Sequence, residues 1–383
     1  MKYKLNDIFD LQMGKTPSRN NGDYWNSKEY KWISIADLTK TGKYISNTKE
    51  YLSKVAVEES GINVIPANTV IMSFKLSIGK TAITAEDMYS NEAIMAFHDK
   101  HIVEILPEYI FYLFKYRNWD TGSNKAVMGK TLNKATLSGV EIEICSIEKQ
   151  RKIVRNLDKI MGILERREKE LELLQDFVKA RFVEMFGDPV ANDKRWDTLS
   201  LENACKTIID CPHSTPSYTH ENTGFMCIRT SIVKKNRILW DDIEYIPEDE
   251  FEKRIQRKKP TVGDIVYTRE GAILGIAAII DRNYNVALGQ RSMLLSPDTD
   301  KCASEFLCVA MNSDSFLDNV LKGVSGSASP HINVGDIKAF KMIMPPVELQ
   351  NQFAEFVQAV DKLKLLSLIL RIHIPYFCSK CYD

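Results

Sequence analysis

The longest periodic pattern of apolar residues in the chain runs from Ser146 to Phe186 and predicts one long helix. Its apolar residues recur at spacings of three, four or seven, which places them on a narrow stripe. The stripe consists of Ile153, Leu157, Ile160, Leu164, Leu171, Leu174, Val178, Phe182 and Met185. Ser146 is a suitable N-cap, and Gly187 followed by Pro189 provides a stop signal. At 1.5 Å per residue, the helix should be roughly 60 Å long.

Residues 1–145 have a different pattern, in which short β-branched and aromatic runs alternate with turn-forming segments. Residues 106–116 are the exception, because a helix is expected to start after Pro107. Its dense aromatic face is interpreted as core packing. Residues 187–346 return to the pattern of short strands and turns.

The two halves of the chain repeat one pattern. The passage TLNKATLSGVEIEICSIEKQRKIVRNLDKI, from Thr131, aligns without a gap with HINVGDIKAFKMIMPPVELQNQFAEFVQAV, from His331. The identical pairs include Asn133 with Asn333, Glu148 with Glu348, and Gln150 with Gln350. This period is far longer than that of any solenoid. The chain is therefore expected to be a tandem of two large modules, each ending in a strand, a turn and a helix.

The repeat continues upstream, where residues 65–83 (IPANTVIMSFKLSIGKTAI) correspond to residues 260–280 (PTVGDIVYTREGAILGIAAII). Further on, Glu92 stands opposite Gln290 and Met95 opposite Met293. The segments between these matching passages are less similar. A single scaffold that carries different recognition residues in its two copies would produce this mixture of strong and weak similarity.

These patterns predict an α+β protein in which a long helix separates two modules of mixed strands and short helices. The long helix needs a partner, and the obvious one is its repeat copy, which would pack antiparallel to it. The expected segments are a first module (1–145), a spacer helix (146–186), a second module (187–346), a distal helix (347–372) and an atypical tail (373–383).

Composition indicates a soluble cytoplasmic protein. No apolar run approaches the roughly 20 residues needed to span a membrane, and the N-terminus has no signal-peptide pattern. The cysteines are scattered without a paired framework, as is usual for reduced thiols. The formal net charge of zero argues against a nucleic-acid binder unless charge is segregated. Two local basic runs, Lys234–Arg237 and Arg254–Lys259, leave that possibility open.

Three Gly-Lys-Thr triplets, starting at Gly14, Gly79 and Gly129, suggest a phosphate-binding loop at first sight. A Walker A loop also requires a glycine five residues earlier. Those positions hold Phe9, Phe74 and Asn124, so no nucleotide site is expected.

Other cofactor sites are also not expected. The Met344–Val347 segment (MPPV) lacks the flanking residues of an adenine-methyltransferase loop and is interpreted as the entry to the distal helix. The Cys and His residues between Cys205 and Cys227 do not have the spacing of zinc-ligand pairs. Cys378 and Cys381 form a CxxC pair only in the atypical tail.

Taken together, the duplicated helix starts (SIEKQRKIV and PVELQNQFA), the KARFVEMFGDPV linker and the strand pairs IMSFKLSIGKTAI and IVYTREGAILGIAAI carry a family resemblance. The chain resembles the specificity subunit of Type I restriction–modification systems. The resemblance implies that both modules are target-recognition domains, each reading half of a bipartite site in double-stranded DNA. It also implies a helical ruler docked to two adenine-N6 methyltransferase subunits, which a motor and nuclease subunit joins for restriction.

The resemblance further implies a non-catalytic subunit without cofactors of its own. S-adenosylmethionine, ATP and Mg would be bound by the partner subunits. Polar and basic loop residues are the expected DNA contacts, since Arg and Lys pair with guanine edges and Asn and Gln with adenine edges. The candidates are Lys15, Thr16, Ser18, Arg19, Asn20, Lys75, Lys80, Lys125, Lys130, Arg229, Thr230, Lys234, Lys235, Arg237, Arg269, Gln290, Arg291 and His331.

The second helix does not end like the first, because the charged continuation is replaced after Leu366 and Pro375 cannot continue a helix. The tail is interpreted as truncated or out of frame, the alternative being natural divergence. A truncated subunit would be an inactive or partner subunit in a recombining locus. Two other interpretations remain: a nuclease or fused methyltransferase, and a coiled-coil scaffold that does not bind DNA specifically.

Overall fold

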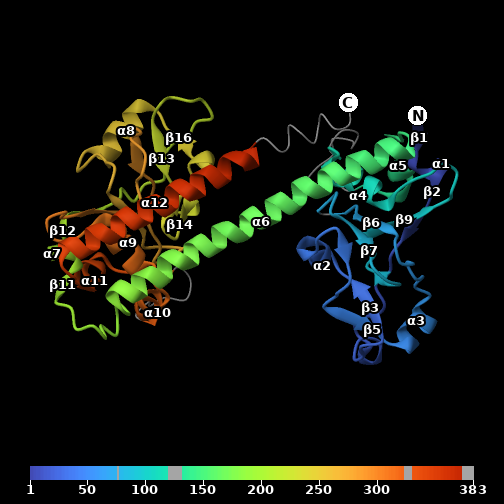
Figure 1. Cartoon of the computed structure of the whole chain (residues 1–383), viewed down its shortest axis with the longest axis horizontal. Helices are drawn as coiled ribbons and strands as arrows, with labels where there is room; N and C mark the ends of the chain where they lie inside the picture. The colour runs from blue at the N-terminus through green and yellow to red at the C-terminus, as the bar shows by residue number, and fades with distance from the viewer. Residues whose placement is uncertain (76, 120–131, 323–329, 373–383) are drawn as a thin grey trace. The chain divides into compact units, whose positions relative to one another are not determined.

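A computed structural model describes residues 1–75, 77–119, 132–322 and 330–372, with side chains in the last helix described up to Lys364. The chain divides into two compact units, one containing Met1–Arg166 and the other Arg167–Leu370 (Figure 1). The boundary falls within helix α6 (Ile147–Phe186).

The first unit is built on a five-stranded sheet in the order β2-β9-β6-β7-β4 and a three-stranded sheet in the order β5-β3-β8. A separate pair joins β1 to β10. The strands are β1 (Lys2–Lys4), β2 (Phe9–Met13), β3 (Tyr30–Ile33), β4 (Tyr44–Ile45), β5 (Glu50–Leu52), β6 (Val70–Ser73), β7 (Thr81–Thr84), β8 (Tyr89–Ser90), β9 (Ile94–Asp99) and β10 (Glu141–Glu143). The short helices are α1 (Leu5–Ile8), η1 (Gly22–Tyr24), α2 (Ile35–Lys40), α3 (Lys54–Ser60), α4 (Pro107–Tyr116) and α5 (Lys134–Ser138).

Side chains of the five-stranded sheet alternate between two cores, as the twofold period of a strand requires. Val70 and Met72 pack into the core that contains α4, while Ile71 packs into a second core with Ile33. The aromatic helix predicted after Pro107 is confirmed. Its buried residues are Tyr109, Ile110, Phe111, Tyr112 and Phe114.

The second unit has a four-stranded sheet in the order β12-β20-β17-β18 and a three-stranded sheet in the order β16-β13-β19. β11 pairs with β21, and β14 with β15. The strands are β11 (Thr198–Ser200), β12 (Cys205–Asp210), β13 (Met226–Ile228), β14 (Val233–Lys234), β15 (Arg237–Ile238), β16 (Glu244–Tyr245), β17 (Ile265–Thr268), β18 (Ala277–Ile279), β19 (Val286–Leu288), β20 (Ser292–Pro297) and β21 (Lys341–Ile343). The helices are α7 (Leu201–Ala204), η2 (Thr230–Ile232), η3 (Trp240–Asp242), α8 (Glu248–Ile255), α9 (Ser304–Met311), α10 (Asp314–Lys322), α11 (Val334–Ala339) and α12 (Val347–Ile372).

The repeat read from the sequence is present in the strand registers. Met72 pairs with Met95 in the first unit, and Tyr267 pairs with Met293 in the second. The turn before β6 uses Asn68 with φ 60°, and the turn before β17 uses Gly263 with φ 90°. Both residues are types that tolerate the left-handed region. The tandem of two α+β modules on one scaffold is therefore confirmed.

Helix α6 has the predicted ends. The Ser146 hydroxyl accepts the Lys149 amide at 3.4 Å, and Gly187 (φ 76°) donates its amide to the Val183 carbonyl at 2.8 Å. The apolar stripe is buried near both ends of the helix, for example at Leu157 and Phe182. Between them the stripe is only partly covered within the described residues.

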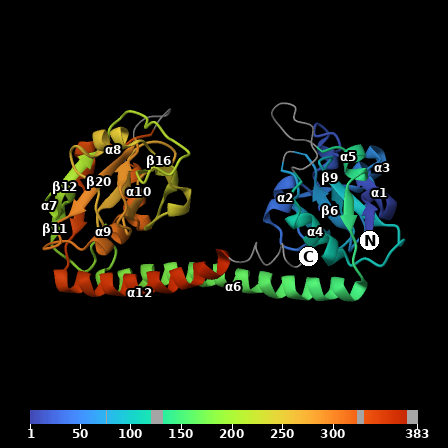
Figure 2. The same cartoon turned by 90° about the horizontal axis from the view of Figure 1, so that it is seen from above.

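In the second unit, α12 packs antiparallel to the later part of α6, as predicted (Figures 1 and 2). Phe353 contacts both Phe182 and Phe186, with ring centroids 5.5 and 5.4 Å apart. Further along α12, Phe356 lies 5.1 Å from Phe177. Later residues of α12 thus meet earlier residues of α6, and aromatic side chains form the seam.

Each long helix is attached to its unit by a buried glutamine. Gln150 accepts the Leu106 amide at 2.9 Å and donates to the carbonyls of Glu104 and Cys145. Gln350 accepts the Ala303 amide at 2.9 Å. It donates to two carbonyls in the same way, those of Lys301 and Pro345. Both glutamines are fully buried.

Replacing Gln350 by Leu should lower the free energy of unfolding by ~3 kcal/mol, because buried backbone groups left without partners cost ~1–3 kcal/mol each. Urea denaturation of the full chain measures this. Gln358→Leu is the matched control, since Gln358 is exposed on the same helix and bonds only to the Glu305 side chain. Equal, small effects of the two substitutions would show that the glutamine does not anchor the helix.

Candidate nucleic-acid interface

In the first unit, one edge of the five-stranded sheet collects several of the predicted DNA contacts. β2 and β6 end there and β7 and β9 begin there, as the pairs Met13–Met95 and Ser73–Ile94 show. We call this the loop edge of the unit. The predicted contacts in the loops leaving it are Lys15, Thr16, Lys75 and Lys80.

The loop after β2 is held tightly against the start of β9. Gly14 donates its amide to the Ile94 carbonyl at 3.0 Å, and a Cβ at Gly14 would lie 2.2 Å from the Asn91 carbonyl oxygen. The exposed Lys15 ammonium donates to the Ser60 carbonyl. Glycine is required at position 14 because any side chain would collide with the backbone. The loop is therefore preorganised.

The predicted contacts beyond this loop are also anchored. Lys80 donates to the Thr39 hydroxyl at 2.5 Å. The guanidinium of Arg19 lies 3.8 Å from the centre of the Trp25 ring and pairs with Glu50. Trp25 in turn donates its indole N–H to the Ser18 carbonyl at 3.0 Å. Of the remaining predicted contacts described in this unit, Ser18 and Asn20 are exposed, and the Lys75 ammonium lies 5.3 Å from the Phe74 ring.

The second unit has the same loop edge, where β12 and β17 end and β18 and β20 begin. The predicted contacts Arg269, Gln290, Arg291 and His331 lie there. Arg269 donates its amide to the Arg291 carbonyl at 3.1 Å, and His331 forms a β-bridge with Glu270. Residues widely separated in the sequence are thus brought together.

Arg269 is buried, and carboxylates already hold its guanidinium. It pairs with Asp210 at 2.9 and 3.3 Å and with Glu270 at 2.7 Å. His213 reaches the same Asp210 carboxylate at 3.1 Å. The geometry therefore favours a positioning role for Arg269 within the loop edge over direct contact with DNA.

Arg229 and Thr230 follow β13, beside the loop edge, because Gly289 donates its amide to the Ile228 carbonyl at 2.9 Å. Arg229 pairs with Glu244 at 2.9 Å and lies 5.5 Å from the centre of the Tyr218 ring. Its guanidinium is thus held in place while remaining partly exposed.

The β14–β15 hairpin carries Lys234, Lys235 and Arg237. It lies beside the start of β18, since Asn236 donates its amide to the Ala277 carbonyl at 3.0 Å. Lys234 donates to the Ser231 carbonyl, Lys235 pairs with Asp314 at 2.9 Å, and Arg237 is exposed. The basic run read from the sequence is therefore a hairpin at the margin of the loop edge.

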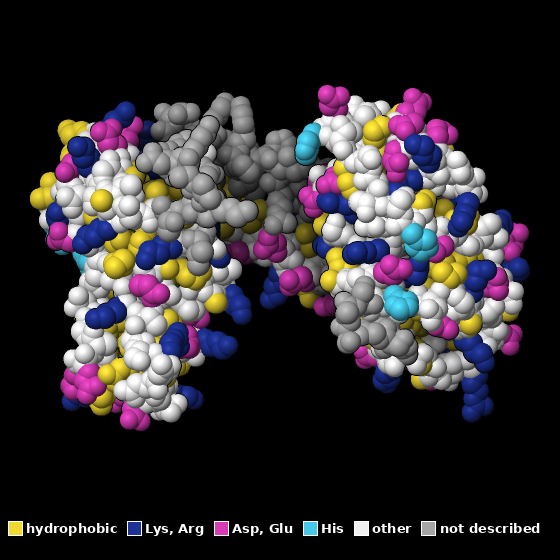
Figure 3. All heavy atoms as spheres, turned by 180° about the vertical axis from the view of Figure 1, so that it is seen from behind, with side chains coloured by type: hydrophobic (Ala, Val, Ile, Leu, Met, Phe, Trp, Pro, Cys, Tyr) yellow, Lys and Arg dark blue, Asp and Glu magenta, His cyan; other side chains and the backbone are white. Residues whose placement is uncertain are grey.

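Lys125 and Lys130 lie outside the described residues. No sequence pattern predicted the carboxylates that face the basic candidates, among them Glu50, Glu244 and Asp210. Glu92 aligns with Gln290 in the repeat but was not among the predicted contacts. Figure 3 shows acidic and basic side chains interspersed on one face of each unit, which agrees with the zero net charge.

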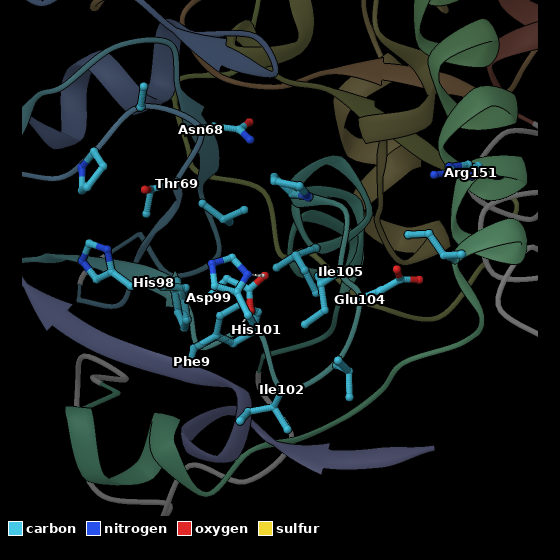
Figure 4. Close-up of a pocket in the computed structure, with 18 residues that line it drawn as sticks. Phe9, Asn68, Thr69, His98, Asp99, His101, Ile102, Glu104, Ile105 and Arg151 are labelled. Atoms are coloured by element: carbon cyan, nitrogen blue, oxygen red, sulfur yellow. Dashed lines mark hydrogen bonds and ion pairs between the residues drawn. The ribbon is translucent and has the colours of Figure 1, made fainter.

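The opposite edge of the first unit's sheet holds a cleft of about 730 Å³ (Figure 4). His98, Asp99, His101 and Arg151 are among its lining residues. Burial lowers the pKa of His98 below its ordinary value, with Asp10 acting in the opposite direction. None of the described DNA candidates lines this cleft.

Burial also decides the chemistry of the cysteines between Cys205 and Cys227. Burial raises the pKa of the Cys205 and Cys227 thiols to about 12, so both thiols are protonated at neutral pH. Within the described residues, no group of three or more His, Cys, Asp or Glu side chains could hold a metal ion. Among all the residues that the structure describes, no helix is long and apolar enough to cross a membrane.

The family described as "Type I restriction modification DNA specificity domain" matches residues 1–173 and 195–370. The chain therefore belongs to this family and carries two such domains. It is 23% identical over 377 residues to the specificity subunit of the Type I restriction enzyme MjaIX from Methanocaldococcus jannaschii. That alignment covers 93% of this chain and 85% of the relative.

Solved structures share the fold. The S subunit of the Type I restriction–modification system from M. genitalium aligns with a TM-score of 0.52 and 14% identity, covering 100% of this chain and 95% of its own. A chain from a structure concerning complex assembly and conformational transition of the type I R-M system aligns with a TM-score of 0.57 and 17% identity. The second alignment covers 100% of this chain and 97% of the other. The two tandem domains and the helix pair are thus features of this fold.

The ion pairs of Arg269 generate a stability prediction. The equivalent positions in the first unit are Phe74 for Arg269 and Met13 for Asp210, as the strand registers show. Arg269→Phe alone should lower the free energy of unfolding by ~3 kcal/mol, because it leaves two half-buried carboxylates without their partner. The double change Asp210→Met with Arg269→Phe should recover part of that loss, because it removes one of the two unpaired carboxylates and leaves Glu270.

Urea denaturation of the single and double variants, with Asp210→Met completing the cycle, measures the coupling. Arg291→Met serves as the control, since Arg291 is exposed at the same edge and its replacement should change the stability by less than about 0.5 kcal/mol. Strictly additive effects of the two substitutions would contradict the pairing.

Proposed function

We propose that this chain is the sequence-specific DNA-binding subunit of a Type I restriction–modification complex and that each unit reads one half of a bipartite site. The observation that carries this proposal is the duplicated loop edge. The same strand ends present polar and basic side chains in both units, but the side chains differ. To recognise two different half-sites, the same scaffold must present different side chains in its two copies.

The anchored cations suit DNA recognition. Arginine and lysine contacts to phosphates fix the register of a protein on the duplex, while side chains that reach base edges select the sequence. Arg19 and Arg229 are each held by a carboxylate and an aromatic ring. A guanidinium held this way loses less rotamer freedom on binding.

The helices are proposed to act as ruler and docking site. At 40 residues, α6 is about 60 Å long, or on the order of two turns of DNA at ~34 Å per turn. In this proposal, α6 and α12 bind two adenine-N6 methyltransferase subunits, and restriction subunits join the assembly. The chain itself is non-catalytic and cytoplasmic, and the partner subunits bind S-adenosylmethionine, ATP and Mg.

Two alternatives keep specific support. The first is a truncated, inactive or partner subunit in a recombining locus, because the charged continuation of the first helix is replaced after Leu366 in the second. Pro375 and the rest of the tail lie outside the described residues. A scaffold without specific DNA binding remains the second alternative, because the surface charge is mixed.

The decisive experiment is a genome-wide map of N6-methyladenine in cells that express this chain with its methyltransferase subunit. Cells with the methyltransferase alone provide the control. A new split motif with a fixed gap is the expected result. If no motif appears, replacing the residues after Leu366 by those that follow Arg166 would extend α12 with the charged continuation of α6. Repeating the map with that variant distinguishes a truncated subunit from a wrong proposal.

Lys15→Ala should weaken DNA binding by the assembled complex at all sequences alike. It should also reduce the slope of log affinity against log salt by about 1, since one phosphate contact is lost. Titrations at several salt concentrations measure this. Lys100→Ala is the matched control, because Lys100 follows β9 at the opposite edge, where it pairs with Asp10. The assignment fails if the two variants change the slope equally.

A further inference from the structure

The loop edges of both units contain the same hydrogen bond with one chemical difference. In the first unit, the Thr16 hydroxyl donates to the Glu92 carboxylate. In the second, the Thr215 hydroxyl donates to the Gln290 side-chain oxygen at 3.2 Å. Each threonine precedes a buried proline in the loop after the first strand of the sheet.

The acidic or amide partner also occupies the same place in both units. Glu92 lies two residues before β9, and Gln290 lies two residues before β20. Both side chains reach solvent. The duplication has therefore kept the position and its threonine, and it has changed a carboxylate into an amide of almost equal shape.

The negative charge of Glu92 restricts which groups of DNA its carboxylate can contact if this edge binds DNA. No Lys or Arg among the described residues lies within 4.0 Å of its carboxylate, although Lys15, Lys75 and Lys80 share the edge. A carboxylate next to a phosphate is repelled. It accepts hydrogen bonds only, and in the major groove the exocyclic amino group of cytosine is the donor that suits it.

Gln290 has different capabilities. Its amide both donates and accepts, so it can bond simultaneously to the N7 and N6 positions of adenine. The threonine hydroxyl uses one lone pair of the side-chain oxygen and leaves the other lone pair and the amino group available. The bond to Thr215 thus orients the amide without exhausting its capacity.

We propose that Glu92 and Gln290 are equivalent specificity-determining residues, with Glu92 reading a cytosine in one half-site and Gln290 reading an adenine in the other. Thr16 and Thr215 are positioning residues that hold them. This inference rests on the proposed function and deepens it. It assigns one base of each half-site to one side chain.

The test exchanges the two side-chain chemistries in the full chain, assembled with its methyltransferase subunits. The variants are Glu92→Gln and Gln290→Glu, each mapped by genome-wide N6-methyladenine sequencing. Glu92→Gln should change one base of one half-site from cytosine to adenine and leave the gap and the other half unchanged. Gln290→Glu should make the reverse change in the other half.

Competition binding to the original site and to its single-base variant supplies a second measurement. Glu92→Gln should shift the preference between the two sites by about 10-fold or more. Glu86→Gln is the matched control, because Glu86 is an exposed carboxylate in the turn after β7, at the opposite edge. This control should leave both the motif and the preference unchanged.

The outcomes separate the inference from the proposed function. A split motif from the wild-type chain that stays identical in Glu92→Gln, or a uniform loss of methylation without a change of base, overturns the inference and leaves the proposed function standing. The absence of any split motif from the wild-type chain, even after α12 is extended, overturns both. A thermal melt of each variant shows whether it has remained folded.

Discussion

The hydrogen bonds of two buried glutamines fix where each long helix begins on its unit. A fully buried amide needs all its partners, since an unpaired polar group in the interior costs ~1–3 kcal/mol. Gln150 and Gln350 satisfy this need identically, each with one backbone amide and two backbone carbonyls. The direction in which each helix leaves its strand and turn is therefore tightly specified.

Near the loop edge, the two units share one scaffold but differ in the residues that are buried inside it. The first unit places the buried Phe74 where the second places the buried Arg269. An apolar side chain needs only space, whereas a buried guanidinium needs carboxylates, and Asp210 and Glu270 supply them. Strand registers remain the same although the chemistry has changed. This separation of frame from loop chemistry lets two readers share one fold.

The ion pairs within each unit show how a chain of zero net charge holds cations in defined places. Some of the cations predicted to contact DNA are paired with a carboxylate of the same unit, as Arg19 is with Glu50 and Lys235 with Asp314. Such pairs reduce the overall field but hold the cations in defined places. Recognition of a sequence depends on the placement of side chains more than on total charge, because phosphate attraction is independent of sequence. A neutral composition is therefore compatible with a DNA-specificity domain.

The amino-acid sequence alone predicted the duplication, the ends of α6, the aromatic helix α4 and the antiparallel packing of α12. These features depend on local patterns: a cap at Ser146, a left-handed glycine at Gly187, and apolar residues at helical spacing. It also pointed to many loop residues that the fold gathers at equivalent edges.

How those loop residues are held depends on contacts that form only in the folded chain. The tertiary structure shows that Arg269 is buried between carboxylates, that Arg19 lies against Trp25, and that Thr16 meets Glu92. Each of these contacts joins segments far apart in the chain. Strand pairing sets which segments meet at an edge, and a single sequence carries no local signal for the partner of a polar side chain.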